Sequence, residues 1–242
     1  MKGIILAGGQ GTRLSPLTEI TNKHLLPIGK EPMIWHGVKQ LVLAGIEETL
    51  VVTSTIHMGH IVNSLGSGKR FGCKLTYKVQ DEPLGIAHAL SLAEDFANQQ
   101  KIVVLLGDNI FEKSIKQHVD AFRQQDKGAR VLLKKVGDPE RFGIAALDEQ
   151  QVISIEEKPT EPSSNFAVVG CYMYDSKVFD YIKQIPLSAR GELEITSVNN
   201  IYIKKNELMY GIVSGKWMDA GTFESMKNAN QMMLQANNKI ME

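Results

Sequence analysis

The sequence has few of the features that mark secreted, membrane or nucleic-acid-binding proteins. Its two cysteines, Cys73 and Cys171, form no CxxC pair among the 242 residues. Lysine plus arginine and aspartate plus glutamate number 27 each, so the net charge is zero and bulk binding to nucleic acid is not expected. No apolar run approaches the roughly 18 residues of a membrane span, and a strand-like run begins at Lys2 with no leader pattern before it. We therefore expect a reduced, cytoplasmic protein that binds neither membranes nor nucleic acid.

Strand and helix patterns alternate through the first half of the chain. The periodicity of the apolar residues predicts strands over 2–6, 49–54, 74–79 and 102–106, and helices over 33–44, 57–65 and 86–96. Strands separated by helices form right-handed crossovers and a parallel sheet. We therefore expect an α/β doubly wound fold with a mostly parallel central sheet.

The alternation loosens after about residue 130. The sequence predicts strands over 130–135, 152–157 and 168–174, with only turns between the first two, and helices over 177–184, 196–205 and 222–239. In the last helix Phe223, Met226, Ala229 and Met233 form one apolar stripe. Because there is no repeat or linker, we expect a single domain over 1–242, with a smaller, β-rich half after residue 130.

The run IILAGGQGTRLSPLT, from Ile4 to Thr18, places a glycine-rich turn at the end of the first predicted strand. Glycines let backbone N–H groups approach an anion closely. Arg13 and Lys23 follow as cations that could neutralise a polyphosphate. The turn fits neither the Walker sequence nor GxGxxG, so a plain strand-to-helix turn stays open as an alternative.

Asp108 follows the predicted strand 102–106. In an open parallel sheet the carboxyl ends of the strands share one edge, so Asp108 should face the glycine turn. A carboxylate there suits a phosphate-bound Mg²⁺, although Asp is also common as a helix cap or turn residue. His57 and His60 share a helical face but have no third ligand at a zinc-like spacing, so we predict no zinc site there.

Several stretches in a fixed order cover nearly the whole chain. The glycine run and NKHLLP are followed by QDEPLGIAHA, LLGDNIF, EEKP, RGELEIT and WMDAGT. Together they resemble the signature of the sugar-nucleotide pyrophosphorylases, which are nucleotidyltransferases that join a nucleoside triphosphate to a sugar 1-phosphate. LGDNIF and RGELEIT look most like the members that use dTTP and glucose 1-phosphate, at the first step of dTDP-rhamnose synthesis.

The resemblance implies a Rossmann-like fold, in-line attack of the sugar phosphate on the α-phosphorus of dTTP, and a homotetramer. It assigns nucleotide contacts to Leu6, Gly8, Gly9, Gly11, Thr12, Arg13, Lys23, Gln80, Gly85 and Asp108, with Gln80 and Gly85 reading the thymine. It assigns sugar-phosphate contacts to Asn109, Gly143, Glu157, Lys158, Val169, Arg190 and Thr196. It makes Asp108 and Asp219 the Mg²⁺ ligands, and Arg13, Lys23, Asp108 and Lys158 the catalytic group.

Other readings of the same sequence stay open. The enzyme could use UTP, which lacks one methyl group of dTTP, or another hexose phosphate. A sugar-nucleotide sensor without catalysis is a more distant alternative, and EEKP alone would suit a solvated surface turn. Long members of the family continue for several tens of residues and build a regulatory nucleotide site there. This chain ends at Glu242, so the expectation of such a site does not carry over.

Overall fold

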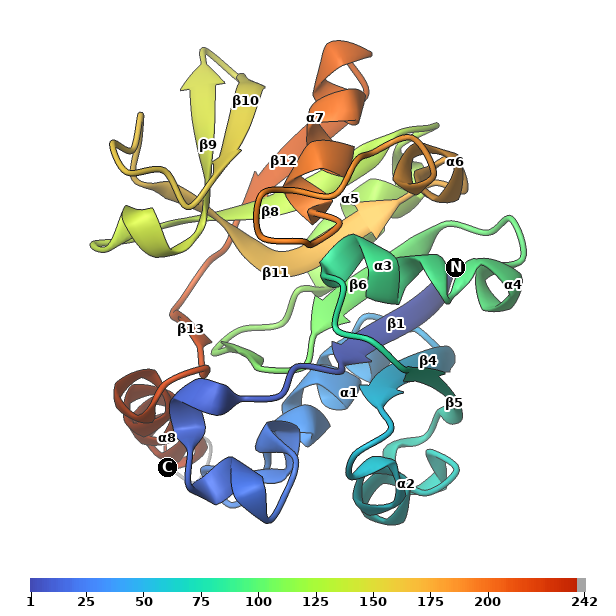
Figure 1. Cartoon of the computed structure of the whole chain (residues 1–242), viewed down its shortest axis with the longest axis vertical. Coiled ribbons are helices and arrows are strands. Elements are labelled where there is room, and N and C mark those ends of the chain that lie inside the picture. Colours follow the sequence, from blue (N-terminus) through green and yellow to red (C-terminus); the bar gives the residue numbers. More distant parts are fainter. Residues whose placement is uncertain (239–242) are drawn as a thin grey trace.

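The centre of the molecule is a nine-stranded sheet, which the computed structural model describes together with the rest of residues 1–238 (Figure 1). Four of its strands, β6 (Ile102–Leu106), β1 (Lys2–Ala7), β4 (Glu48–Ser54) and β5 (Lys74–Gln80), lie side by side in this order. All three pairings among them are parallel. β1 is apolar and buried because it lies inside the sheet with helices on both faces. The predicted α/β fold is confirmed.

Five further strands make up the second part of the sheet. β8, β9, β10, β11 and β12 span Ala129–Lys135, Gly143–Asp148, Gln151–Glu157, Phe166–Tyr174 and Leu208–Ile212, respectively. β11 connects the two parts, because it pairs antiparallel with β6 and also with β8 and β9. β10 then pairs with β9, and β12 pairs with β8.

One edge of β11 changes its partner part-way along the strand. Ala167 pairs with β9, whereas the residues from Cys171 onward pair with β6. The sheet therefore opens into a fork at Val168, Val169 and Gly170. The Gly170 N–H finds its partner in a side chain instead and donates to Asn109 Oδ1 at 2.9 Å.

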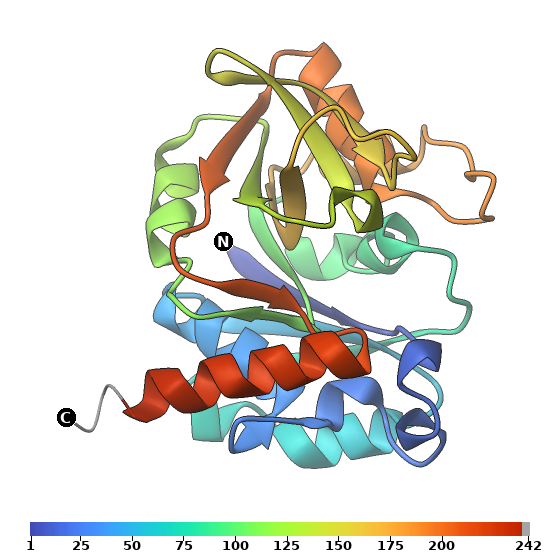
Figure 2. The ribbon, with the colours of Figure 1, turned by 90° about the vertical axis from the view of Figure 1, so that its left-hand side faces the viewer.

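Helices cover both faces of the sheet, as a doubly wound fold requires (Figures 1 and 2). One apolar core lies between the sheet and α1 (Met33–Leu43), α2 (Met58–Leu65) and α5 (Lys116–Gln124). The other lies between the sheet and α3 (Ile86–Ser91), α4 (Glu94–Ala97), α6 (Val178–Ile182) and α7 (Ile195–Lys204). None of the helices within residues 1–238 combines the length and the apolar character that crossing a membrane requires.

The last helix, α8 (Phe223–Asn238), packs outside the sheet (Figure 2). Its Ala229 and Met232 are buried in a small core of their own. Two short antiparallel ladders lie against it. They pair β2 (Pro27–Ile28) with β3 (Glu31–Pro32), and β7 (Asn109–Phe111) with β13 (Trp217–Asp219).

Three predicted segments differ from the structure. The predicted helix 86–96 is divided into α3 and α4 just after Ser91, whose hydroxyl donates to the His88 carbonyl oxygen at 2.7 Å and competes with the helical hydrogen bonds. The interval predicted as turns only, between 135 and 152, contains β9. In α8, Phe223 is 47% exposed at the first helical position, so it does not belong to the buried stripe. Lys239 of the predicted tail helix lies outside the described residues.

Candidate active site

The glycine run follows β1 and forms one wall of a cavity of about 340 Å³, which we call the loop cavity. A Cβ on Gly8 would lie 2.6 Å from Gln80 Oε1, so any larger residue there would displace the Gln80 amide. Gly11 has a φ of +70°, and a Cβ there would lie 2.9 Å from side-chain atoms of Lys23 and Thr18. Glycine at these two positions lets the loop close onto Gln80 and Lys23.

Gln80 and Gly85 form another wall of the loop cavity. Gln80 is only 6% exposed, and its Nε2 lies 3.0 Å from His88 Nδ1, which fixes the amide. Gly85 has a φ of +99°, and a Cβ there would lie 2.7 Å from the Leu193 carbonyl oxygen. The cavity therefore offers a fixed amide edge beside bare backbone, which suits a planar polar group.

Asp108, two residues after the end of β6, forms an ion pair with Lys23 in which both side chains are largely buried. Burial acts to raise the pKa of Asp108. The Lys23 ammonium and the hydrogen bonds from Lys23 and Asn109 outweigh burial and hold the pKa well below its usual range. Asp108 is therefore a carboxylate at neutral pH, and it lines the loop cavity together with Lys23.

The ladder between β7 and β13 brings Asp219 to the same place. Asp219 lies opposite Asn109 in the ladder, and the Ala220 N–H donates to the Asp108 carbonyl oxygen at 2.9 Å. Burial and repulsion by the Asp108 carboxylate raise the pKa of Asp219 to about 6. Two carboxylates from distant parts of the sequence thus share one site.

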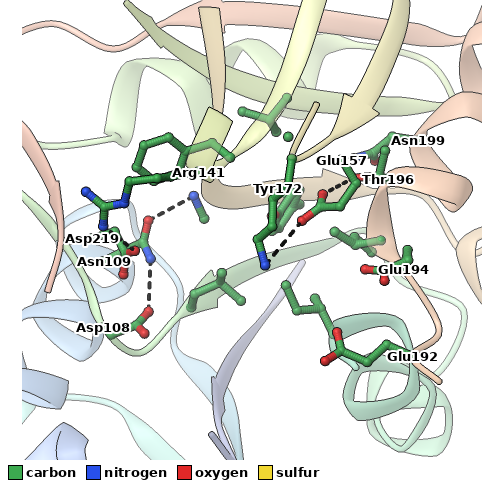
Figure 3. Close-up of a pocket in the computed structure, with 18 of the residues that line it drawn as sticks. Asp108, Asn109, Arg141, Glu157, Tyr172, Glu192, Glu194, Thr196, Asn199 and Asp219 are labelled. Atoms are coloured by element: carbon green, nitrogen blue, oxygen red, sulfur yellow. Dashed lines mark hydrogen bonds and ion pairs between the residues drawn. The ribbon is translucent and has the colours of Figure 1, made fainter. Parts of the chain in front are cut away.

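A second cavity, of about 490 Å³, fills the fork in the sheet (Figure 3). We call it the fork cavity. Val168 and Gly170 of β11 line it at the opening of the fork. It adjoins the loop cavity, because five residues line both: Arg13, Ile86, Leu106, Asp108 and Glu192. Molecules bound in the two cavities would therefore meet at Asp108.

Charged groups of both signs gather around Glu157 in the fork cavity. Glu157 Oε2 accepts a hydrogen bond from the Thr196 hydroxyl at 2.7 Å. Glu157 Oε1 lies 4.0 Å from Lys158 Nζ and 3.6 Å from Arg190 Nη2. Arg190 also donates to both carboxylate oxygens of Glu194, at 2.9 Å each. This region offers hydroxyl, carboxylate and cationic groups within one pocket.

Comparisons with known proteins show which family the chain belongs to. Residues 2–236 match the family described as nucleotidyl transferase. The chain belongs to this family. It is 42% identical over 233 residues to a glucose-1-phosphate thymidylyltransferase of Neisseria meningitidis, covering 95% of this chain and 81% of that protein. It is 38% identical to the protein of the same name from Mycolicibacterium smegmatis, covering 96% of this chain and 82% of that one.

Solved structures of nucleotidyl transferases share the fold. One from Bacillus anthracis, provisionally named a glucose-1-phosphate thymidylyltransferase and in complex with sucrose, is 54% identical with a TM-score of 0.93. The match covers 97% of this chain and 95% of that one. A UDP-glucose pyrophosphorylase complexed with UDP-glucose has a TM-score of 0.86 at 23% identity, covering 97% and 98% of the two chains, and this match bears on the fold alone.

Most of the predicted site residues of this nucleotidyl transferase line one of the two cavities. The loop cavity has Leu6, Gly8, Gly9, Arg13, Lys23, Gln80, Gly85 and Asp108. The fork cavity has Arg13, Asp108, Asn109, Gly143, Glu157, Lys158, Arg190, Thr196 and Asp219. Gly11, Thr12 and Val169 line neither cavity. The Val169 side chain is fully buried in the core on the α1 side of the sheet, so only its backbone remains for a ligand.

The Asn109 side chain of this nucleotidyl transferase is fixed by hydrogen bonds to its own protein neighbours. Its Oδ1 accepts from the Gly170 N–H at 2.9 Å and from Trp217 Nε1 at 2.8 Å. Its Nδ2 donates to Asp108 Oδ1 at 3.0 Å. Asn109 therefore connects the fork, the β7–β13 ladder and Asp108, which is a positioning role.

Arg141 of this nucleotidyl transferase lines the fork cavity but was not predicted from the sequence as a site residue. Arg141 Nη1 lies 2.6 Å from Asp138 Oδ2, and Nη2 lies 3.9 Å from Asp219 Oδ2 at the edge of the fork cavity. The only signal in the sequence is its position two residues before Gly143, within a turn that has no periodicity to interpret.

Proposed function

We propose that this nucleotidyl transferase joins dTTP to glucose 1-phosphate, giving dTDP-glucose and pyrophosphate. The observation that carries the proposal is that Asp108 lines both cavities, so that two substrates would meet at one carboxylate. The names of the relatives from Neisseria meningitidis and Mycolicibacterium smegmatis support this choice of substrates.

The loop cavity would hold dTTP. Backbone N–H groups of the glycine loop approach the phosphates, and the side chains of Arg13 and Lys23 neutralise their charge. The amide of Gln80, fixed by His88, hydrogen-bonds the edge of the thymine. Gly85 lines the same cavity and offers its backbone beside the base.

The fork cavity would hold glucose 1-phosphate. Glu157 and Thr196 hydrogen-bond hydroxyl groups of the sugar, and the backbone at Gly143 and Val169 lies beside its ring. Lys158 and Arg190 hold the phosphate. Lys158 is 48% exposed at its side chain, so it can move from its 4.0 Å contact with Glu157 toward a bound anion.

Asp108 and Asp219 fit a divalent cation, which we infer to be Mg²⁺. They are hard oxygen donors brought to one site, and their mutual repulsion contributes to the raised pKa of Asp219. Within residues 1–238 no group of three or more His, Cys, Asp or Glu side chains could hold a metal ion. Two carboxylates are enough for Mg²⁺, because it commonly binds one or two of them and completes its shell with phosphate oxygens and water. Bound there, it would orient the phosphates and offset the charge that develops on them.

The residues of the chain then position two anions and neutralise them. A phosphate oxygen of glucose 1-phosphate attacks the α-phosphorus of dTTP, the bond from this phosphorus to the β-phosphate oxygen breaks, and pyrophosphate leaves. Lys158 holds the attacking phosphate in line, while Arg13 stabilises the charge on the departing pyrophosphate. No side chain needs to form a covalent bond.

The test is to incubate the protein with Mg²⁺, glucose 1-phosphate and one nucleoside triphosphate at a time, and to measure pyrophosphate release. We expect dTTP to react fastest and mass spectrometry to identify dTDP-glucose. Faster turnover with UTP would show that the enzyme prefers uracil to thymine, the two bases differing by one methyl group. Binding of nucleotide without any turnover would point to a sensor and contradict the proposal.

The homotetramer, the cytoplasmic location and the place in dTDP-rhamnose synthesis stay predictions that rest on the resemblance. Light scattering during gel filtration would measure the mass of the assembly.

A further inference from the structure

Asn199 is a buried polar side chain in the wall of the fork cavity. It follows Thr196 by one turn of α7, so the two side chains share a face of the helix. The residue is only 1% exposed. Figure 3 shows it near Thr196 and Glu157, on the side of the cavity opposite Asp108.

One end of the Asn199 amide is held by the protein. Its Oδ1 accepts a hydrogen bond from the Tyr174 hydroxyl at 2.6 Å. Tyr174 is fully buried and stacks on Tyr202, with ring centroids 5.7 Å apart. The amide therefore cannot turn without breaking this hydrogen bond.

The other end of the amide has no partner. Nδ2 of Asn199 is buried and makes no hydrogen bond within the part of the chain that the structure describes. Buried donors in proteins are almost always paired with protein, water or ligand, because an unpaired one has lost its hydration without compensation. A donor that is fixed, buried and unpaired in a cavity wall points to an acceptor supplied from the cavity.

We propose that Asn199 Nδ2 donates a hydrogen bond to a hydroxyl oxygen of the bound hexose and so selects sugars that carry this hydroxyl. The inference rests on the proposed function, in which the anomeric phosphate lies near Asp108. The ring then extends away from Asp108 toward Asn199. The hydroxyl is therefore one remote from the anomeric carbon, at position 3, 4 or 6 of the hexose.

The fixed donor explains why the choice would be strict. A site that hydrogen-bonds a substrate hydroxyl discriminates against an analogue without it, because the buried group of the protein is then left unpaired. Thr196 and Glu157 already hydrogen-bond each other and can rearrange when a sugar binds. Asn199 has no such alternative within residues 1–238.

The test compares kcat/KM for glucose 1-phosphate with kcat/KM for its 3-deoxy, 4-deoxy and 6-deoxy analogues, with dTTP and Mg²⁺. In the wild type we expect the analogue without the hydroxyl that Asn199 binds to be poorer by at least about tenfold. The double variant Asn199→Leu/Tyr174→Phe removes both partners of the hydrogen bond, so no hydroxyl is left unpaired in the core. In this variant the ratio for that analogue should fall to about one, and the other two ratios should not change.

Asn200→Leu is the matched control. The Asn200 side chain accepts from the Ile155 N–H at 3.0 Å and donates to the Ile155 carbonyl oxygen at 2.8 Å, and it does not line the fork cavity. This control should lower the melting temperature and leave every ratio as in the wild type. If circular dichroism shows that the double variant is unfolded, the single variant Asn199→Leu supplies the same ratios.

Two results would overturn the role of Asn199. One is a wild type that uses all three analogues as well as glucose 1-phosphate. The other is a variant that keeps the wild-type ratios, or loses activity equally with all four sugars. Failure of the proposed function is distinguishable, because it appears as no pyrophosphate release from dTTP and glucose 1-phosphate by the wild type.

Discussion

Asp108 and Asp219 are the two side chains whose charge the reaction should need most. Replacing either by asparagine keeps the shape and one oxygen but removes the charge that a divalent cation requires. We expect Asp108→Asn and Asp219→Asn each to lower kcat by at least about a hundredfold, since metal binding stabilises the transition state by several kcal/mol. The measurement is kcat at several Mg²⁺ concentrations.

Asp120→Asn is the control for these two variants. Asp120 is an exposed carboxylate that pairs with Lys116 and Arg123 on α5 and lines neither cavity. Its kcat should equal that of the wild type. Near-normal turnover by both Asp108→Asn and Asp219→Asn would show that the carboxylates do not hold the metal.

Lys158 could be either a cation that binds substrate or one partner of a surface ion pair, and the two roles predict different effects of its removal. As a surface pair with Glu157, it would contribute only a fraction of a kcal/mol to stability and nothing to turnover. As the group that holds the sugar phosphate, its loss in Lys158→Ala should lower kcat/KM for glucose 1-phosphate by roughly two orders of magnitude. Calorimetry should find dTTP binding almost unchanged.

Lys135→Ala, at an exposed lysine on β8, is the matched control for Lys158→Ala. It should change neither kcat/KM for glucose 1-phosphate nor the binding of dTTP. Equal damage to both substrates in Lys158→Ala would contradict the division between the two cavities.

At the scale of helices and strands, periodicity predicted what is long and regular. The four strands of the parallel part and helices α1, α2, α6, α7 and α8 lie where apolar spacing placed them, with ends shifted by a few residues. α5 escaped prediction because its buried residues are only Val119 and Phe122. β7 and β13 have three residues each, which is too short for any period to be visible.

The candidate site was predicted in its parts but not in its assembly. The glycine loop and Asp108 follow from the rule that ligands bind at the carboxyl ends of parallel strands. Asp219 was assigned by resemblance alone, because its place depends on the β7–β13 ladder. The polar wall at Asn199 and Arg141 could not be predicted, since it forms only where the sheet forks.

The β7–β13 ladder should matter for catalysis as well as for stability. Trp217→Phe removes the hydrogen bond from Nε1 to Asn109 Oδ1 and so loosens the connection among Asn109, Asp108 and Asp219. We expect the melting temperature to fall by about 2–4 °C, the effect of about 1 kcal/mol in a protein of this size. We also expect kcat to fall by about tenfold, because a misplaced carboxylate stabilises the transition state less well.

Trp35→Phe is the matched control, at a tryptophan on α1 that lies outside the ladder and lines neither cavity. It removes a hydrogen bond of similar geometry, from Nε1 to Ser64 Oγ at 3.0 Å, between α1 and α2. Its melting temperature should fall by a similar amount while kcat stays the same. Equal kcat values in the two variants would show that the ladder only stabilises the fold.

For the whole molecule, the raised pKa of Asp219 should connect pH, metal and stability. The metal binds the deprotonated carboxylate, and Asp219 takes up a proton as the pH falls through about 6. We therefore expect Mg²⁺ to raise the melting temperature at pH 7.5 and to lose most of this effect at pH 5. Differential scanning calorimetry at a fixed Mg²⁺ concentration measures it.

In Asp219→Asn, the effect of Mg²⁺ on the melting temperature should be the same at pH 7.5 and at pH 5. The same Mg²⁺ effect at both pH values in the wild type would mean that Asp219 does not control metal binding.

Because of the fork at β11, the two cavities are lined mainly by different segments of the chain. Apart from the residues they share, the loop cavity is built from the chain up to Ala89, whereas the sugar-facing wall of the fork cavity comes from β9, β10, β11 and α7. Substitutions in that wall, other than at Gly170, whose N–H is bonded to Asn109, leave the glycine loop and the Asp108–Lys23 pair untouched. Sugar preference can therefore drift, or be redesigned by exchanging side chains of that wall while Glu192 and Leu193, which adjoin the loop cavity, are kept, and the choice of nucleotide is preserved in the amino-terminal half.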